Sequence, residues 1–145
     1  MGSETSNNIR QRITEFFSSK EEVLFVYLFG SVITKEKFRD IDIAIYMDLM
    51  PDLLSQGKLQ SALDSLIEYK VDLVLLNELP SKNPAFVYNI VTTGELLINK
   101  DKSVHTEYKS KALQYYFDTA YLRNQFDEVF HQRMKADKFG ERNYE

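Results

Sequence analysis

Cysteine is absent from this chain of 145 residues, and only two histidines are present. Without cysteine the protein can form neither a disulfide framework nor a thiolate metal site, and two isolated histidines are too few for a zinc centre. A metal site in this chain would therefore use oxygen ligands. His105 and His131 lie near or on a polar helical segment, so we expect both at the surface.

Long apolar runs and an excess of positive charge are missing as well. No run approaches the roughly 20 residues that a membrane-spanning helix requires, and the polar N-terminus MGSETSNNIR does not resemble an export signal. We therefore expect no membrane association and a cytoplasmic location. The net charge of −4 and the pI near 5.3 argue against direct binding of nucleic acid through a basic surface.

The length and the 43% hydrophobic content are typical of one folded domain over residues 1–145. We expect its core at about residues 7–100 and a helical extension at about 103–138. Ile9, Ile13 and Phe17 recur at helical spacing, which predicts an amphipathic helix. A second helical stripe consists of Leu54, Leu59, Leu63, Leu66 and Ile67.

Two carboxylates, Asp40 and Asp42, open an apolar strand in the segment DIDIAIY. Successive side chains of a strand point to opposite faces, so both carboxylates share one face while the isoleucines share the other. Two ionised carboxylates this close repel each other unless a cation lies between them. Magnesium suits the pair, because it takes carboxylate oxygens together with substrate phosphates.

Gly30 and Ser31 follow a buried strand, VLFVYLF from Val23 to Phe29. A glycine allows close approach to the backbone N–H groups, and the serine adds a hydroxyl donor, so the pair suits phosphate oxygens. Alone, Gly-Ser is more often an ordinary turn. The order of strand, Gly-Ser, spacer and D-x-D strand is more specific.

A third carboxylate, Asp72, interrupts a later apolar strand in KVDLVLL. If this strand lies beside the Asp40 strand, Asp72 could join the same metal site and accept the proton of an attacking hydroxyl. The alternative is that Asp72 is solvated at the strand end or caps a neighbouring loop.

This succession of motifs resembles the DNA polymerase β-like nucleotidyltransferase superfamily in its small stand-alone form, and in particular the minimal nucleotidyltransferase (MNT) antitoxins. The resemblance covers about residues 21–100, including NIVTTGELLINKD from Asn89 to Asp101. It implies an α/β (α+β) nucleotidyltransferase fold, with a small mixed β-sheet flanked by helices and followed in this chain by a long C-terminal helix.

The resemblance also implies an activity. Asp40, Asp42 and Asp72 would be catalytic and would hold two Mg²⁺ ions, and the triphosphate of ATP would lie against Gly30 and Ser31. Proteins of this family commonly pair with a helical HEPN-domain ribonuclease toxin, and in studied cases they transfer AMP to a tyrosine of that toxin.

The loop between the motifs departs from the family pattern. Its eight residues, VITKEKFR, are fewer than usual, and Val32 and Ile33 occupy the places of a small residue and an arginine. Lys35, Lys37 and Arg39 could supply positive charge to the triphosphate, and we take Lys37 and Arg39 as candidate nucleotide-binding residues. The alternative is an ordinary solvated loop.

The C-terminal segment predicts one long amphipathic helix. Its stripe consists of Tyr108, Ala112, Tyr115, Thr119, Leu122, Phe126 and Val129 or Phe130. The stripe could simply pack on the core. A helix of some thirty residues would reach about 45 Å, however, so its end could also form a homo-oligomeric or hetero-oligomeric contact.

Three functions are compatible with these residues. The first is an antitoxin that transfers AMP to its partner toxin, since the chain has no second domain to enclose a small acceptor. The second is a small-molecule nucleotidyltransferase of the aminoglycoside-modifying kind, completed by a second subunit. The third is an antitoxin that acts by binding alone. The sequence determines neither the acceptor, nor the preferred nucleotide, nor the number of nucleotides transferred.

Overall fold

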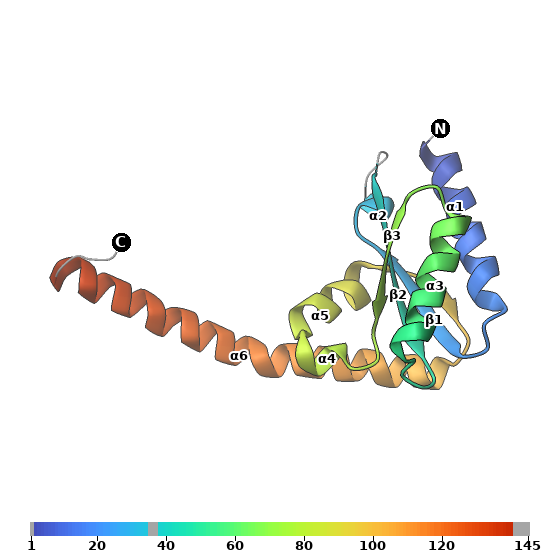
Figure 1. Ribbon diagram of the computed structural model, residues 1–145. Helices are drawn as coiled ribbons and strands as arrows, with labels where there is room; N and C mark the ends of the chain where they lie inside the picture. The colour runs from blue at the N-terminus through green and yellow to red at the C-terminus, as the bar shows by residue number, and fades with distance from the viewer. Residues whose placement is uncertain (1, 35–37, 141–145) are drawn as a thin grey trace.

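A computed structural model describes the backbone of residues 2–34 and 38–140, and the side chains of residues 5–34, 38–120 and Leu122. The elements in chain order are α1 (Gly2–Ser18), β1 (Val23–Phe29), α2 (Ser31–Thr34), β2 (Asp40–Met47), α3 (Leu53–Leu66), β3 (Lys70–Leu75), α4 (Leu79–Lys82), α5 (Pro84–Thr93), β4 (Glu95–Asn99) and α6 (Lys102–Gly140). Figure 1 shows a sheet with helices on both faces and α6 extending far beyond it.

The four strands form one mixed sheet in the order β3-β2-β1-β4. The β1 strand pairs antiparallel with β2 and with β4, whereas β2 and β3 are parallel. The crossover through α3 makes the parallel pairing possible, because parallel neighbours need a long connection. The prediction of a small mixed sheet flanked by helices and followed by a long C-terminal helix is therefore confirmed.

One face of the sheet is covered by α1 and α3 (Figure 1). The isoleucines of β2 are fully buried on this face against Ile13 and Phe17 of α1 and Leu63 of α3. The predicted stripe of α3 is only partly correct, because Leu54 is 69% exposed and Leu66 36% exposed. Leu59 and Leu63 of α3 and the following residue Ile67 are buried, so these residues of the stripe reach the core.

The opposite face carries the other residues of β2, including Ala44 and Tyr46, and is covered by α5 and α6. Val87 and Ile90 of α5 are fully buried there. The Asn83 side chain accepts a hydrogen bond from the backbone N–H of Phe86 and caps α5, as the Asn-Pro sequence indicates.

The N-terminal helix α1 begins at Gly2, and Ser6 within it is buried. Arg10 Nε donates to a carboxylate oxygen of Glu95 over 2.9 Å, which ties α1 to β4. Nothing in the local sequence indicates this pairing across the sheet.

The apolar stripe of α6 packs on the domain over its first turns, and the burial of its described side chains then decreases. Tyr108 and Ala112 are buried, and the Tyr108 hydroxyl donates to the backbone oxygen of Leu76 over 2.7 Å. Tyr115 is already 42% exposed and Leu122 is 65% exposed. The interpretation that the whole stripe packs on the core is thus wrong for Tyr115 and Leu122, while the side chains of Phe126, Val129 and Phe130 lie outside the described residues.

His105 is not the surface residue that we expected. Its ring is half-buried, lies 4.9 Å from the ring of Phe25, and shares a 2.7 Å hydrogen bond with the Tyr27 hydroxyl. Burial, followed by the charge of Lys109, lowers the pKa of His105, and burial raises the pKa of Tyr27 to about 12. Both groups join α6 to β1. The side chain of His131 lies outside the described residues.

Within the described residues, none of the helices has both the length and the apolarity that a membrane span needs.

Candidate active site

The three predicted carboxylates lie on neighbouring strands. In the parallel pairing of β2 with β3, Asp40 is opposite Lys70 and Asp42 is opposite Asp72. Paired residues of adjacent strands project to the same face, so Asp42 and Asp72 emerge together. The sequence left open whether β3 lies beside β2, and the register now brings Asp72 to the Asp42 side chain. We refer to Asp40, Asp42 and Asp72 as the carboxylate cluster.

The electrostatics of the cluster are unfavourable without a counter-ion. Burial raises the pKa of Asp42, and the charge of Asp72, a hydrogen bond between these two carboxyl groups and the charge of Asp40 raise it further. Each of these causes disfavours the ionised form. A bound cation would reverse their effect, because its charge stabilises both carboxylates at once.

The cluster offers the oxygen ligands that a hard divalent cation prefers. Asp72 affects the pKa of Asp42 through both its charge and a hydrogen bond, and Asp40 affects that pKa through its charge alone and more weakly. Among the described residues no three Asp, Glu, His or Cys side chains are gathered closely enough to hold a metal ion by themselves. A metal at this site would thus need ligands from the substrate, as magnesium commonly takes from phosphates.

Gly30 lies directly against the cluster. Its φ angle is +82°, and a Cβ atom built at this position would be 2.2 Å from Oδ2 of Asp42. Any side chain at this position would both strain the backbone and collide with the carboxylate. The absence of a Cβ atom at Gly30 therefore makes room for the Asp42 carboxylate, while the approach of phosphate to this backbone stays a prediction.

Ser31 begins the single-turn helix α2, whose first N–H groups have no acceptor within the helix. Its side chain is half-buried, next to Gly30. Val32 is 3% exposed, and Ile33 packs on the same core cluster. The departure from the family pattern thus has a structural reason, because these two side chains anchor α2 to the core instead of facing a nucleotide.

The candidate cationic residues are only partly placed. Lys35 and Lys37 lie outside the described residues. Arg39 is exposed immediately before β2 and makes no ion pair within the part of the chain that the structure describes. Its role in nucleotide binding stays a prediction.

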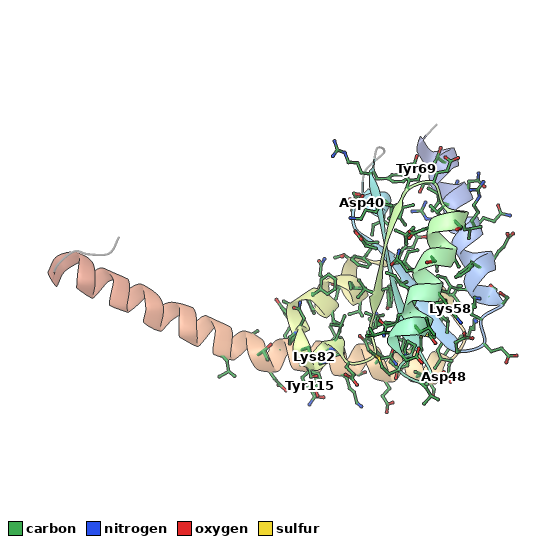
Figure 2. All side chains as sticks on the ribbon, viewed as in Figure 1. Asp40, Asp48, Lys58, Tyr69, Lys82 and Tyr115 are labelled. Carbon is green, nitrogen blue, oxygen red and sulfur yellow. The ribbon has the colours of Figure 1, made fainter. Side chains whose placement is uncertain are left out.

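Two features near the cluster were missed by the sequence analysis. Lys70 precedes Asp72 by two residues on the same face of β3, and its Nζ is 4.0 Å from Oδ1 of Asp72. The rings of Phe38 and Tyr69 lie 5.0 Å apart, and Figure 2 shows Tyr69 at the same end of the sheet as Asp40. The K-x-D spacing could have revealed Lys70, whereas the ring pair depends on the sheet order.

Comparisons with known proteins identify the family of the chain. The sequence model of the family described as polymerase beta, nucleotidyltransferase, matches residues 11–103. No curated protein matches the chain significantly.

Several solved structures contain a chain of similar fold. One is a toxin–antitoxin with AMP-PNP, with a TM-score of 0.68 at 25% identity, covering 83% of this chain and 98% of that chain. The toxin–antitoxin MntA-HepT gives a TM-score of 0.65 at 23% identity, covering 86% and 98%. A complex of the tri-AMPylated Shewanella oneidensis HEPN toxin with MNT antitoxin gives 0.62 at 24% identity, covering 90% and 99%.

Proposed function

The chain belongs to the polymerase beta nucleotidyltransferase family, and from this membership we propose that it is the antitoxin of a HEPN–MNT pair. It transfers AMP from ATP to a tyrosine hydroxyl of its partner, a HEPN ribonuclease toxin, in the cytoplasm. The observation that carries the proposal is the pairing of Asp42 with Asp72 across two strands beside Gly30.

The structural relatives support the choice of partner and substrate. The chains of similar fold come from toxin–antitoxin structures, one of them with AMP-PNP and another with a tri-AMPylated HEPN toxin. Those chains are matched over nearly their whole length. The proposal therefore extends to this chain a pairing that its relatives display.

The transfer itself needs an attacking oxygen and a leaving group in line. The tyrosine oxygen forms a bond to the α-phosphorus of ATP while the bond from that phosphorus to the bridging oxygen of the β-phosphate breaks, and pyrophosphate leaves. Asp72 accepts the hydroxyl proton, which a phenol with an ordinary pKa near 10 otherwise retains at neutral pH. Gly30 allows the triphosphate to approach the backbone, and the Ser31 hydroxyl donates to a phosphate oxygen.

The carboxylate cluster would hold Mg²⁺, with two ions expected in this family. Magnesium, when bound, would neutralise charge on the triphosphate and lower the pKa of the acceptor hydroxyl. The raised pKa of Asp42 fits this role, because crowded carboxylates gain most from a shared cation. Lys37 and Arg39 would add positive charge near the phosphates.

A second candidate is an antitoxin that acts by contact alone. The burial of Val32 favours it, because this residue, which follows the Gly-Ser pair, serves core packing instead of nucleotide binding. Neutralisation of the toxin requires the carboxylate cluster in the first candidate and does not require it in the second. If Asp42→Asn leaves neutralisation intact, contact alone is the mechanism.

The experiment that tests transfer uses α-labelled ATP and magnesium with the proteins that co-purify with this chain. We expect label on one partner, and we expect the double variant Asp40→Asn/Asp42→Asn to lose it. Asp48→Asn is the matched control, since Asp48 is exposed at the opposite end of β2 (Figure 2) and should keep full transfer. Absence of label on any protein, despite saturable ATP binding, would contradict the proposal.

A further inference from the structure

Lys70 lies on the same face of the sheet as the carboxylate cluster. In the register of β2 with β3 it is directly opposite Asp40, and it precedes Asp72 by two residues on the same strand. Neighbouring strands lie about 4.8 Å apart, and residues two apart on a strand share a face. Lys70 therefore adds one ammonium group to the carboxylates of the cluster.

The Lys70 ammonium group is close to the cluster without being bound tightly to it. Its Nζ is 4.0 Å from Oδ1 of Asp72, which is an ion-pair distance but too long for a hydrogen bond. The side chain is 72% exposed, and Lys70 makes no other ion pair within the described residues. The N–H donors of this group are therefore available to a ligand.

The described residues that follow Gly30 and Ser31 supply no such charge. Val32 is 3% exposed, and Ile33 packs on the core. In the part of the chain that the structure describes, Lys70 is the only cation that forms an ion pair with a member of the cluster. An anion bound at the cluster would therefore meet the charge of Lys70.

The proposed reaction indicates which anionic group this is. Asp72 faces the attacking oxygen, because it accepts the proton of that hydroxyl, and the attacking oxygen forms its bond to the α-phosphorus. Pyrophosphate leaves in line on the opposite side of the α-phosphorus, and thus away from Asp72. Since Nζ of Lys70 lies beside Asp72, the α-phosphate is the phosphate nearest to it. The neutral acceptor hydroxyl attracts an ammonium group less than a phosphate oxygen does.

We propose that Lys70 binds the α-phosphate of the nucleotide by donating a hydrogen bond to a non-bridging oxygen. The inference rests on the proposed function, because the role of Asp72 as the base determines where the α-phosphate lies. Lys70 keeps its proton throughout, so the bonds that form and break are those of the transfer described above. Its charge stabilises the negative charge of the non-bridging oxygens while the α-phosphorus passes from the leaving oxygen to the attacking one.

The first test is a calorimetric titration of the chain alone with ATP and magnesium, which requires no acceptor. Lys70→Gln should weaken ATP binding about tenfold, because it removes a charge-assisted hydrogen bond. Lys70→Arg keeps the charge and should retain most of the affinity. Lys58→Gln is the matched control and should bind ATP like wild type, since Lys58 is an exposed lysine of α3 that Figure 2 shows well away from Asp40.

The alternative is that Lys70 only protects β3, which is an edge strand, from pairing with another chain. Equal ATP affinity of Lys70→Gln and wild type would support this alternative and overturn the inference. An equal loss in Lys70→Arg and Lys70→Gln would overturn it as well, since the charge would then not be what the nucleotide contacts. Thermal unfolding checks the fold, and Lys70→Gln should keep its Tm within about 1 °C because exposed ion pairs contribute little.

Sulfur substitution in ATP identifies the phosphate that Lys70 contacts. Two diastereomers carry sulfur at one or the other non-bridging position of the α-phosphate. The ratio of their dissociation constants should change at least about twofold between wild type and Lys70→Gln, because only one of them keeps the oxygen that Lys70 binds. ATP with sulfur at the γ-phosphate should lose as much affinity in Lys70→Gln as ATP itself. An unchanged ratio of the diastereomers would overturn the assignment to the α-phosphate.

The outcomes separate this inference from the proposed function. If Lys70→Gln loses ATP affinity but the wild-type chain labels no partner, the role of Lys70 stands and the toxin is not the acceptor. If the wild-type chain labels a partner and Lys70→Gln keeps both its ATP affinity and its transfer rate, the proposed function stands and the inference is overturned. If the wild-type chain does not bind ATP, both fail.

Discussion

At Gly30 both the backbone φ angle and the neighbouring Asp42 side chain require a residue without a Cβ atom. The positive φ disfavours any residue with a Cβ atom, and the Asp42 carboxylate already occupies the space that such an atom would need. The sequence alone shows Gly-Ser after a predicted strand. That Asp42 is the group that a Cβ atom at position 30 would meet depends on the pairing of β1 with β2, which places Phe29 opposite Asp42.

Gly30→Ala is expected to destabilise the fold by about 2 kcal/mol and to abolish transfer, because the backbone is strained and Asp42 is displaced. Denaturant unfolding and the labelling assay measure the two effects. Gly57→Ala is the matched control, since a Cβ at Gly57 meets nothing within 4 Å. In the middle of α3 it should stabilise the protein by about 0.5–1 kcal/mol. Equal stability of the two variants would contradict the requirement for glycine at position 30.

The surroundings of Asp42 in the folded protein disfavour its ionised carboxylate, which lowers the stability of the fold when Asp42 is ionised. Its pKa is raised above the unfolded value by burial and then by Asp72 and Asp40, so the folded chain binds more protons than the unfolded one between the two values. Stability is therefore highest below the unfolded pKa and falls as the pH rises through the folded pKa. A cation at the cluster would cancel this loss.

Asp42→Asn is expected to raise the Tm by about 3 °C at neutral pH in a chelator, although it removes transfer. The variant should also lose the contribution of Asp42 to the pH dependence of Tm, which is expected to lower Tm as the pH rises through the pKa of Asp42 in the folded state. Calorimetry across pH, with and without magnesium, measures both effects. A lower Tm for Asp42→Asn in chelator would mean that the ionised carboxylate stabilises the fold, which is the opposite of the expected sign.

At the scale of elements, α6 is fixed to the sheet by a few side chains of its first turns. Tyr108 reaches the Leu76 carbonyl at the end of β3, and His105 shares a hydrogen bond with Tyr27 of β1. The sequence predicted the helix from its spacing, but not these polar anchors. Their partners lie far away along the chain, and only the packed sheet brings them together.

Tyr108→Phe should lower the free energy of unfolding by about 1–2 kcal/mol, because it leaves the buried Leu76 carbonyl without its hydroxyl donor. Tyr115→Phe is the control on the same helix face and should change it by less than about 0.5 kcal/mol, since Tyr115 is 42% exposed. Urea unfolding of the two variants measures the difference. Similar values would mean that the Tyr108 hydrogen bond does not anchor α6.

At the scale of the whole molecule, α6 extends beyond the domain on which its first turns pack. Figure 1 shows the helix continuing well past the sheet, and the exposure of Leu122 marks where it has left the core. We expect this far segment to add little to the stability of the domain and to contact another protein.

Truncation after Leu122 is expected to change the free energy of unfolding by less than about 1 kcal/mol. The same truncation should weaken partner binding and leave ATP binding unchanged. Urea unfolding, partner capture and nucleotide titration measure these three quantities. If the truncated chain unfolds much more readily, the far part of α6 supports the domain, and the two parts do not have separate tasks.

The sequence by itself determined the local units and the chemistry of the site. Alternation in β2 assigned Asp40 and Asp42 to one face, and apolar residues spaced by three and four predicted α6. These signals are local, since each depends on residues within a few positions of one another. The family resemblance rested on the same short motifs.

Only the tertiary structure decided which of these units meet. The parallel register of β2 with β3 paired Asp42 with Asp72, and the antiparallel register with β1 brought Gly30 against that pair. It also decided where the stripe of α6 stops being core, because that depends on the extent of the sheet beneath it. Pairing register and the reach of one element over another are long-range properties, which short sequence patterns do not encode.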